Sequence, residues 1–261
     1  MTEDPYVLRE TTNGIATLTL NRPQARNALS LPMLEAIAAA LKAVAADANA
    51  RVVVIKGSGP AFCAGHDLKE MQAQSFDRAY ANRLFSLCGE VMETVVTLAK
   101  PVITQVHGIA TAAGCQLVAS CDLAIAAAGT RFATPGVNIG LFCSTPMVAL
   151  TRAVAPKHAL HMLLTGDAID TEAAFRIGLI NEIAAPEALD AKVAELAAKL
   201  ASKSPLTLAM GKRAFQRQAD LPLADAYAYT AKVMTDNLQA HDAQEGISAF
   251  IDKRHPEWTG A

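Results

Sequence analysis

The sequence has few of the features that mark nucleic-acid-binding or membrane proteins. Its 261 residues carry 23 lysines and arginines and 25 acids, a formal net charge of −2, and no basic block stands out. Nucleic acids and anionic membranes attract clustered positive charge, so we expect neither as a partner. Charge or proline interrupts every apolar run well before the roughly 20 residues of a membrane-spanning helix. We therefore expect the 52% of hydrophobic residues to be buried in a large core and between subunits.

Paired cysteine motifs and targeting signals are absent as well. The chain starts with MTEDPYVLRE, which has neither the basic and apolar regions of a secretory signal nor the arginine- and serine-rich character of a mitochondrial transit peptide. We therefore expect a cytoplasmic protein. No histidine spacing indicates a metal site, and we expect no metal. The five cysteines have no C-x-x-C spacing, which is typical of reduced thiols; they are Cys63, Cys88, Cys115, Cys121 and Cys143.

Strand and helix patterns alternate in the first half of the chain. Asn13-Gly14 lies between two alternating apolar segments and predicts a hairpin over residues 6–20. Ser30 is placed to cap a helix that has proline in its first turn and runs to about residue 47. A long amphipathic pattern over residues 76–98 predicts a second helix. Short apolar runs predict further strands at residues 51–56, 101–106 and 123–126. This alternation is typical of an α/β core.

From residue 146 onward the pattern is helical, and most of the predicted helices begin at a proline. They cover residues 156–164, 186–201, 205–218, 222–238 and 242–250. We therefore divide the chain into a core over residues 1–200 and a helical segment over residues 201–261. The apolar faces of that segment exceed what one small core would use, so we expect it to mediate oligomerisation.

Two loops of small residues carry the strongest functional signal. The first, Ala64-Gly65-His66-Asp67-Leu68, follows the strand predicted at residues 51–56, and the second runs GIATAAGCQ over residues 108–116 and leads into a helix. Backbone N–H groups at a helix start are free and lie at the positive end of the helix dipole, which suits a developing oxyanion. A plain strand–turn–helix connection is the alternative for the second loop taken alone.

Together the two loops resemble those of the crotonase (enoyl-CoA hydratase/isomerase) superfamily. NRP at residues 21–23, LTG at residues 164–166 and EGISAF at residues 245–250 are similar to other signatures of that family. The runs GHDLKE, ATAAGCQLVASCD and FATPGVN are most similar to one branch, whose chemistry is poorly defined. The resemblance implies an α/β fold, a crotonase-type spiral of repeated β-β-α units with a C-terminal helical trimerisation segment. The assembly would be a homotrimer or a dimer of trimers.

The resemblance also implies an acyl-CoA thioester as the substrate, with coenzyme A as part of the substrate and no separate cofactor. The backbone N–H groups of His66 and Ala113 would polarise the thioester carbonyl. Gly136 and Cys143 would line the acyl pocket. The positions that would lie along the coenzyme A are Ala25, Arg26, Ala64, Asp67 and Leu68, with Lys212 as a weaker candidate near the nucleotide and with Phe250 and Lys253 reaching in from a neighbouring subunit.

Both glutamates that are usual in such a site are missing. Gln116 stands at the first position and Gly136 at the second. Hydration of an enoyl thioester needs proton transfer by positioned groups, each typically worth 10²–10⁴ in rate. Gln116 can orient water but cannot usefully accept a proton, and Asp67 and Asp122, the nearest acids in sequence, favour a structural role. We therefore expect a lyase or isomerase of this family that hydrates its substrate poorly.

Two alternatives remain open from the sequence. Methylmalonyl-CoA decarboxylases of the superfamily resemble the chain at Gly65-His66-Asp67, and they carry Thr-Pro followed by an apolar residue where Gly136 sits. Decarboxylation requires enolate stabilisation and no base at the α-carbon. Those enzymes have a tyrosine about where Cys143 falls, however, and Cys143 is expected as an apolar wall residue. The imidazole of His66 would act in catalysis or pack against the coenzyme A. The second alternative is a non-catalytic CoA-binding protein.

Overall fold

The structure, a computed structural model, describes residues 4–261, so the expectation about a targeting sequence lies partly outside the described residues. A six-stranded sheet in the order β1-β2-β3-β4-β6-β8 forms its centre. β1 and β2 form the antiparallel hairpin predicted at Asn13-Gly14, and the other neighbours pair in parallel. The strands are β1 (Val7–Thr12), β2 (Ile15–Leu20), β3 (Val52–Gly57), β4 (Val102–Val106), β6 (Leu123–Ala127) and β8 (Glu182–Ala184). A second sheet pairs β5 (Ile109–Thr111) with β7 (Arg131–Ala133).

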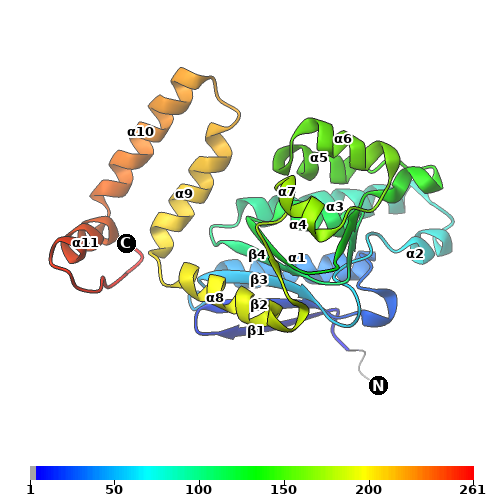
Figure 1. Ribbon diagram of the computed structural model, residues 1–261, viewed down its shortest axis with the longest axis horizontal. Coiled ribbons are helices and arrows are strands. Elements are labelled where there is room, and N and C mark those ends of the chain that lie inside the picture. Colours follow the sequence, from blue (N-terminus) through cyan, green and yellow to red (C-terminus); the bar gives the residue numbers. More distant parts are fainter. Residues whose placement is uncertain (1–3) are drawn as a thin grey trace.

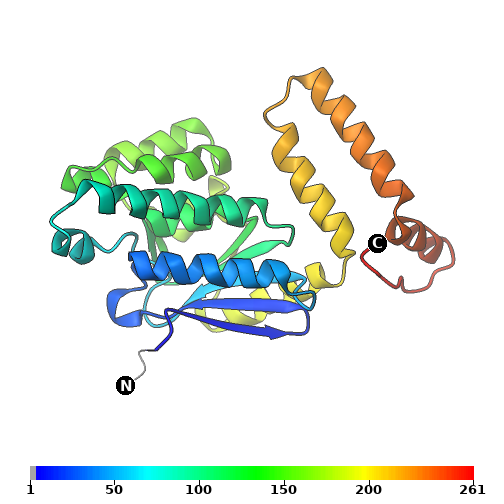
Figure 2. The same ribbon diagram turned by 180° about the vertical axis from the view of Figure 1, so that it is seen from behind.

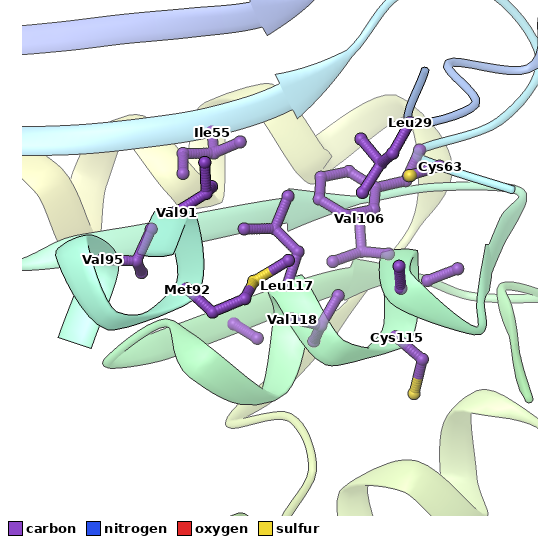
Figure 3. Close-up of a cluster of buried hydrophobic side chains, with 14 of the residues drawn as sticks. Leu29, Ile55, Cys63, Val91, Met92, Val95, Val106, Cys115, Leu117 and Val118 are labelled. Atoms are coloured by element: carbon purple, nitrogen blue, oxygen red, sulfur yellow. The ribbon is translucent and has the colours of Figure 1, made fainter. Parts of the chain in front are cut away.

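Helices cover both faces of the main sheet, because its buried strands are apolar on both sides. Val53 and Ile55 of β3 face the larger core cluster, whereas Val52 and Val54 face the smaller one beneath α8. Figure 3 shows part of the larger cluster, where side chains of α3 and α4 meet those of β3 and β4. The covering helices are α1 (Leu31–Ala46), α3 (Arg78–Thr97), α4 (Ala113–Ser120) and α8 (Leu189–Ala201).

The last helices stand apart from this body. Figures 1 and 2 show α9 (Pro205–Gln218) and α10 (Leu223–Gln239) as a hairpin that projects away from the sheet, and α11 (His241–Ile251) follows α10 at the end that lies beside the start of α9. The remaining helices pack on or between the elements of the core. They are α2 (Leu68–Ala73), α5 (Ser144–Ala153), α6 (Pro156–Thr165) and α7 (Thr171–Arg176), with short 3₁₀ turns η1 (Pro23–Ala25), η2 (Pro135–Ile139) and η3 (Pro186–Ala188).

A buried carboxylate ties the end of the chain to the start of the projecting helices. Asp242 is 1% exposed and accepts hydrogen bonds from Ser204 Oγ at 2.6 Å, from Thr259 N at 2.8 Å and from Gly260 N at 3.1 Å. Trp258 Nε1 donates to a backbone carbonyl oxygen near the end of α8 at 2.8 Å. We call this arrangement the C-terminal clasp. It holds the segment after α11 against the junction between α8 and α9.

The expected α/β fold is confirmed, and most of the expected elements are present. The stretch after residue 146 is not wholly helical, however, because β8 adds a parallel strand next to β6. The helix of the second loop begins at Ala113 and not after Gln116, since the Gln116 N–H already donates to the Ala112 carbonyl oxygen at 3.0 Å. Within residues 4–261, no helix is long and apolar enough to cross a membrane.

Candidate active site

The two predicted loops lie side by side. Cys63 N donates to Ile109 O at 3.1 Å, and Thr111 N donates back to Cys63 O at 3.0 Å, so the loop after β3 runs parallel to β5. A side chain at Gly114 would collide with the Cys63 carbonyl oxygen. The small residues of the second loop therefore let its backbone approach the first loop closely.

This pairing brings the two predicted N–H groups together and leaves both free. The backbone of Leu29 makes hydrogen bonds with the residues before and after His66. Leu29 N donates to Gly65 O at 2.7 Å, and Asp67 N donates to Leu29 O at 3.2 Å. Among residues 4–261 neither the His66 N–H nor the Ala113 N–H donates a hydrogen bond. A Cβ built on Gly65 would lie 3.4 Å from Ala113 N, which shows how close the loops are. The arrangement fits a two-donor site for an oxyanion.

The residue before this helix start has an unusual backbone. Ala112 has φ 49° and ψ −117°, a conformation that glycine adopts readily and alanine does not. Its N–H donates to Ala133 O of β7 at 2.9 Å, and this bond fixes the turn against the second sheet. This costly conformation directly precedes the free N–H of Ala113, so strain is stored at the start of α4.

The His66 imidazole is a neutral, mostly buried group. Its ring meets Phe85 edge-on with 5.1 Å between centroids. Its Nε2 is buried and makes no hydrogen bond to any described residue. Burial lowers the pKa of His66 to about 4, so the ring carries no charge at neutral pH. The side chain thus offers an unpaired polar atom next to the backbone N–H that is proposed to bind the oxyanion.

The two carboxylates near the loops in sequence are both committed to structural contacts. Asp67 caps α2 and accepts from Arg22 Nη1 at 2.5 Å; burial would raise its pKa, but the arginine and the α2 N–H groups outweigh it and lower the pKa. Asp122 lies at the opposite end of α4, where it accepts from Lys212 Nζ and Val102 N, each at 2.7 Å. Neither is free to serve as a base at the thioester.

The positions of the two missing glutamates differ in the space they offer. Gln116 is 3% exposed, its Oε1 lies 4.0 Å from Cys88 Sγ, and its Nε2 has no hydrogen bond in the described part of the chain. At Gly136, an added Cβ would collide with the Leu141 carbonyl oxygen and lie 2.9 Å from Cys143 Sγ. Burial raises the pKa of the Cys143 thiol, which keeps it protonated and suits a wall residue.

The predicted coenzyme A positions are brought together in part. Ala64 N donates to Arg26 O at 3.0 Å, so the η1 turn that contains Ala25 lies against the first loop. Leu68, the first residue of α2, is 52% exposed beside them. These positions can form one binding surface, whereas the Asp67 carboxylate is turned to Arg22 and α2.

Lys212, predicted near the nucleotide, is held by contacts within the protomer. Its ammonium group donates to Val95 O at 3.0 Å, to Lys100 O at 3.2 Å and to Asp122 at 2.7 Å. These acceptors use all three donors of a lysine, so the side chain joins α9 to the core. Phe250 and Lys253 lie at the end of α11, apart from the two loops of the same protomer (Figure 1), and Phe250 is 84% exposed.

Some residues that shape the site were not singled out from the sequence. Asn27 is buried with φ 54°, and its Nδ2 donates to the carbonyl oxygens of Ser58, Ala61 and Phe62 between 2.8 and 3.1 Å. It therefore holds the approach to the first loop. The sequence signal is Asn27-Ala28-Leu29, which follows the NRP signature at residues 21–23. Thr134, just before Gly136, has a buried hydroxyl without a described partner. Residues 4–261 contain no cluster of three or more His, Cys, Asp or Glu side chains that could hold a metal ion.

Comparison with known proteins places these features in a family. The family model for enoyl-CoA hydratase/isomerase matches residues 10–261. Enoyl-CoA hydratase domain-containing protein 3 from Xenopus laevis is 46% identical over 98% of this chain and 86% of its own length. A crystal structure of enoyl-CoA hydratase from Mycobacterium smegmatis is 49% identical, covers 98% of this chain and 99% of that one, and superposes with a TM-score of 0.94.

A crystal structure of human enoyl-CoA hydratase domain-containing protein 3 is 43% identical over 97% of this chain and 100% of that one, with a TM-score of 0.94. The predicted branch is therefore confirmed. The predicted cytoplasmic location is wrong by this comparison, because the Xenopus, rat and human relatives are all named mitochondrial. The matches in sequence and structure show that the chain belongs to the enoyl-CoA hydratase/isomerase family.

Proposed function

We propose that this protein binds an acyl-CoA thioester and stabilises the enolate-like state of its acyl group. The observation that carries the proposal is the pair of unbonded N–H groups, at His66 and Ala113, on two loops in contact. Such donors are worth most where negative charge develops on the thioester oxygen during reaction. Membership of a family that acts on acyl-CoA thioesters supports the substrate class. Coenzyme A enters as part of the substrate.

The residues of the site do not favour efficient hydration of an enoyl thioester. Gln116 offers an amide at the first acid position, and the second position is closed at Gly136. Asp67 and Asp122 are held by Arg22 and Lys212. Without a base for water and an acid for the α-carbon, each worth 10²–10⁴ in rate, hydration is slow.

A second candidate reaction, decarboxylation of a malonyl-type thioester, is favoured by the same closed position. When the bond between the α-carbon and the carboxylate breaks, carbon dioxide leaves and the electron pair passes into the enolate. The two N–H groups then stabilise the enolate oxygen, and water supplies the proton to the α-carbon. No side-chain base is needed for this sequence, and the neutral His66 ring adds no cation that would hold the substrate carboxylate in place.

We further propose that residues 201–261 form the oligomerisation segment of a trimer or a dimer of trimers. In that assembly Phe250 and Lys253 would reach the coenzyme A of a neighbouring subunit. Phe250 lies on α11 and Lys253 just after it, away from the two loops of their own protomer, which supports a role across subunits (Figure 2).

A substrate panel tests the proposed function. Crotonyl-CoA and methylmalonyl-CoA are assayed in parallel, and binding of each is measured by calorimetry. We expect both thioesters to bind and crotonyl-CoA hydration to be very slow. A kcat within tenfold of the usual enzyme value of about 10 s⁻¹ contradicts the proposed loss of both acids. Tight binding without turnover of any thioester supports the third possibility, a non-catalytic CoA-binding protein.

Removal of one N–H donor tests the site itself. Ala113→Pro deletes the donor and keeps a small side chain. With the fold verified by circular dichroism, turnover of the best substrate should fall by about 10²–10³, while binding of free coenzyme A, which has no thioester carbonyl, stays within twofold. Wild-type turnover in a folded Ala113→Pro protein would show that the two-loop site is not where the reaction occurs.

A further inference from the structure

The side-chain amide of Gln116 is held at one end only. Its Oε1 accepts a hydrogen bond from the Cys88 thiol across 4.0 Å, a long bond of the kind that a weak thiol donor makes. Its Nε2 donates to no group of residues 4–261, although the residue is only 3% exposed. Buried polar groups normally have a partner. The unpaired NH₂ group therefore indicates that a bound molecule completes its hydrogen bonding.

The Cys88 thiol decides which end of the amide faces α3. Cys88 is fully buried in α3, and burial raises the pKa of its thiol to about 12, so the thiol stays protonated and can donate. An amide oxygen is a much better acceptor than a thiol sulfur, so the oxygen end of the amide makes the stronger bond with this thiol. The contact thus holds Oε1 on the side of α3 and leaves the NH₂ group on the opposite edge of the amide.

The Gln116 side chain lies beside the two loops of the candidate active site. Gln116 follows Ala113 by three residues on α4, and side chains at this spacing share one face of a helix. Phe85 lies three residues before Cys88 on α3, and its ring contacts the His66 ring with 5.1 Å between centroids. One face of α3 therefore touches both the first loop and the Gln116 amide. An acyl group whose thioester oxygen is bound by the two N–H groups passes close to this amide.

We propose that Cys88 is a positioning residue, which holds the Gln116 NH₂ group toward the acyl group, so that the site selects thioesters with an acceptor oxygen on the third acyl carbon. The proposal rests on the proposed function and specifies its substrates. The three residues from Ala113 to Gln116 rise roughly 4.5 Å. An oxygen on the third carbon is three bonds, at most roughly 4 Å, from the thioester carbon. A keto or carboxylate oxygen there accepts from the NH₂ group, whereas a saturated acyl group leaves it unpaired.

Two thioesters with four acyl carbons test the substrate class. Acetoacetyl-CoA carries a keto oxygen on the third carbon and butyryl-CoA carries none. Calorimetry measures the binding of each to the full-length wild type and to Gln116→Met, in which the side chain keeps nearly the same size and has no N–H donor. We expect the ratio of acetoacetyl- to butyryl-CoA affinity to fall about three- to tenfold in Gln116→Met, the usual contribution of one hydrogen bond.

The wild-type measurements separate this inference from the proposed function. If neither thioester binds to the wild type, the proposed function is wrong. If both bind and the ratio in Gln116→Met equals that of the wild type, the proposed function stands and the inference is overturned.

Two variants of Cys88 test its positioning role. Cys88→Ala and Cys88→Ser have side chains of similar volume, and only serine keeps a donor. We expect the affinity ratio to fall in Cys88→Ala as far as in Gln116→Met, and to stay within twofold of the wild type in Cys88→Ser. An equal fall in both Cys88 variants, or no fall in Cys88→Ala, would show that the thiol does not orient the amide.

The S–H stretching band gives a measurement that needs no Cys88 variant to fold. A hydrogen bond weakens the S–H bond and lowers the frequency of its band in Raman spectra. In Gln116→Met, one of the five thiols should therefore move to higher frequency than in the wild type, because its acceptor is lost. An unchanged S–H spectrum in a folded Gln116→Met protein would overturn the inference.

Discussion

Gly136 is enclosed by the Leu141 carbonyl oxygen and the Cys143 thiol, whereas Gln116 already carries a buried side chain of about the size of glutamate. The two missing acids therefore cannot be restored in the same way. Gln116→Glu is nearly isosteric and should raise crotonyl-CoA hydration at least tenfold, since it supplies one of the two proton-transfer groups. Gly136→Glu should lower the free energy of unfolding by about 1–3 kcal/mol through overpacking, without a gain in hydration.

Urea denaturation and a hydration assay of both variants check this prediction, with Gln116→Ala as the control for loss of the amide. A folded Gly136→Glu protein with wild-type stability and faster hydration would show that the 141–143 segment moves aside easily, and that the site retains the geometry of a hydratase.

The His66 ring predicts a pH dependence of stability. Burial lowers its pKa from 6.5 to about 4, so the unfolded chain binds a proton in this range that the folded protein does not. Stability should therefore fall as the pH drops from about 6.5 to 4, by up to about 3 kcal/mol. His66→Gln should remove this part of the dependence in urea denaturation measured between pH 4 and 7. His158→Gln, at an exposed position, is the control; if it flattens the curve as much, the dependence does not come from His66.

At this scale the resemblance of the two loops to the crotonase superfamily pointed to the N–H groups of His66 and Ala113, and neither donates a hydrogen bond within residues 4–261. The sequence could not predict what the long polar side chains bind. Lys212 fits a nucleotide-binding lysine by position, yet Val95 O, Lys100 O and Asp122 take its donors. Those acceptors lie about 90 residues or more away in the chain, where no local pattern connects them to α9.

Among the elements, the start of α4 combines function with strain. Ala112 has φ 49°, which alanine adopts only at a cost that glycine avoids. Ala112→Gly should therefore raise the free energy of unfolding by about 1 kcal/mol, even though glycine makes the unfolded chain more flexible. Thermal and urea unfolding measure the change. The matched control is Ala119→Gly inside the same helix, which should destabilise by about 1 kcal/mol. Equal losses in both variants would mean that Ala112 is unstrained.

The C-terminal clasp is the second element with a clear energetic role. Asp242 accepts bonds from Ser204, Thr259 and Gly260 while almost fully buried. Asp242→Ala leaves those donors unpaired and should lower the free energy of unfolding by about 2–4 kcal/mol. Limited proteolysis should then cut the segment after α11 first. Asp252→Ala, on an exposed neighbour, should change neither readout. An Asp242→Ala protein with an intact, protected end would show that Trp258 alone holds the segment.

Helices and strands could be predicted from the sequence where the residues of one segment carry the whole pattern. The hairpin at Asn13-Gly14 and the capped helix after Ser30 are local patterns, and both are present. β8 was missed because its three residues become a strand only by pairing with β6. The same holds for β5 and β7, which pair only with each other. Short strands of this kind are fixed by tertiary contacts and not by propensity.

For the whole molecule, the projecting hairpin of α9 and α10 is difficult to explain in an isolated protomer. α10 exposes a stripe of apolar side chains at helical spacing, and each is at least half exposed: Leu223, Tyr227, Met234 and Leu238. A stripe of this kind normally faces a partner. Closed symmetric assembly of identical chains is the commonest solution.

We therefore expect the protein to be a trimer, or a dimer of trimers, at micromolar concentration in light scattering. Tyr227→Lys combined with Met234→Lys places two charges in the stripe and should shift the protein to smaller species, because charge is excluded from the centre of such interfaces. The matched control is Ala228→Lys combined with Thr235→Lys, which adds the same charges one position further along, on another face of α10. The control should keep the wild-type mass.

A monomeric wild type would refute the assembly, and with it the proposed contact of Phe250 and Lys253 with a neighbouring coenzyme A. A control that dissociates as fully as the stripe variant would instead show that the interface covers more of α10 than its apolar face.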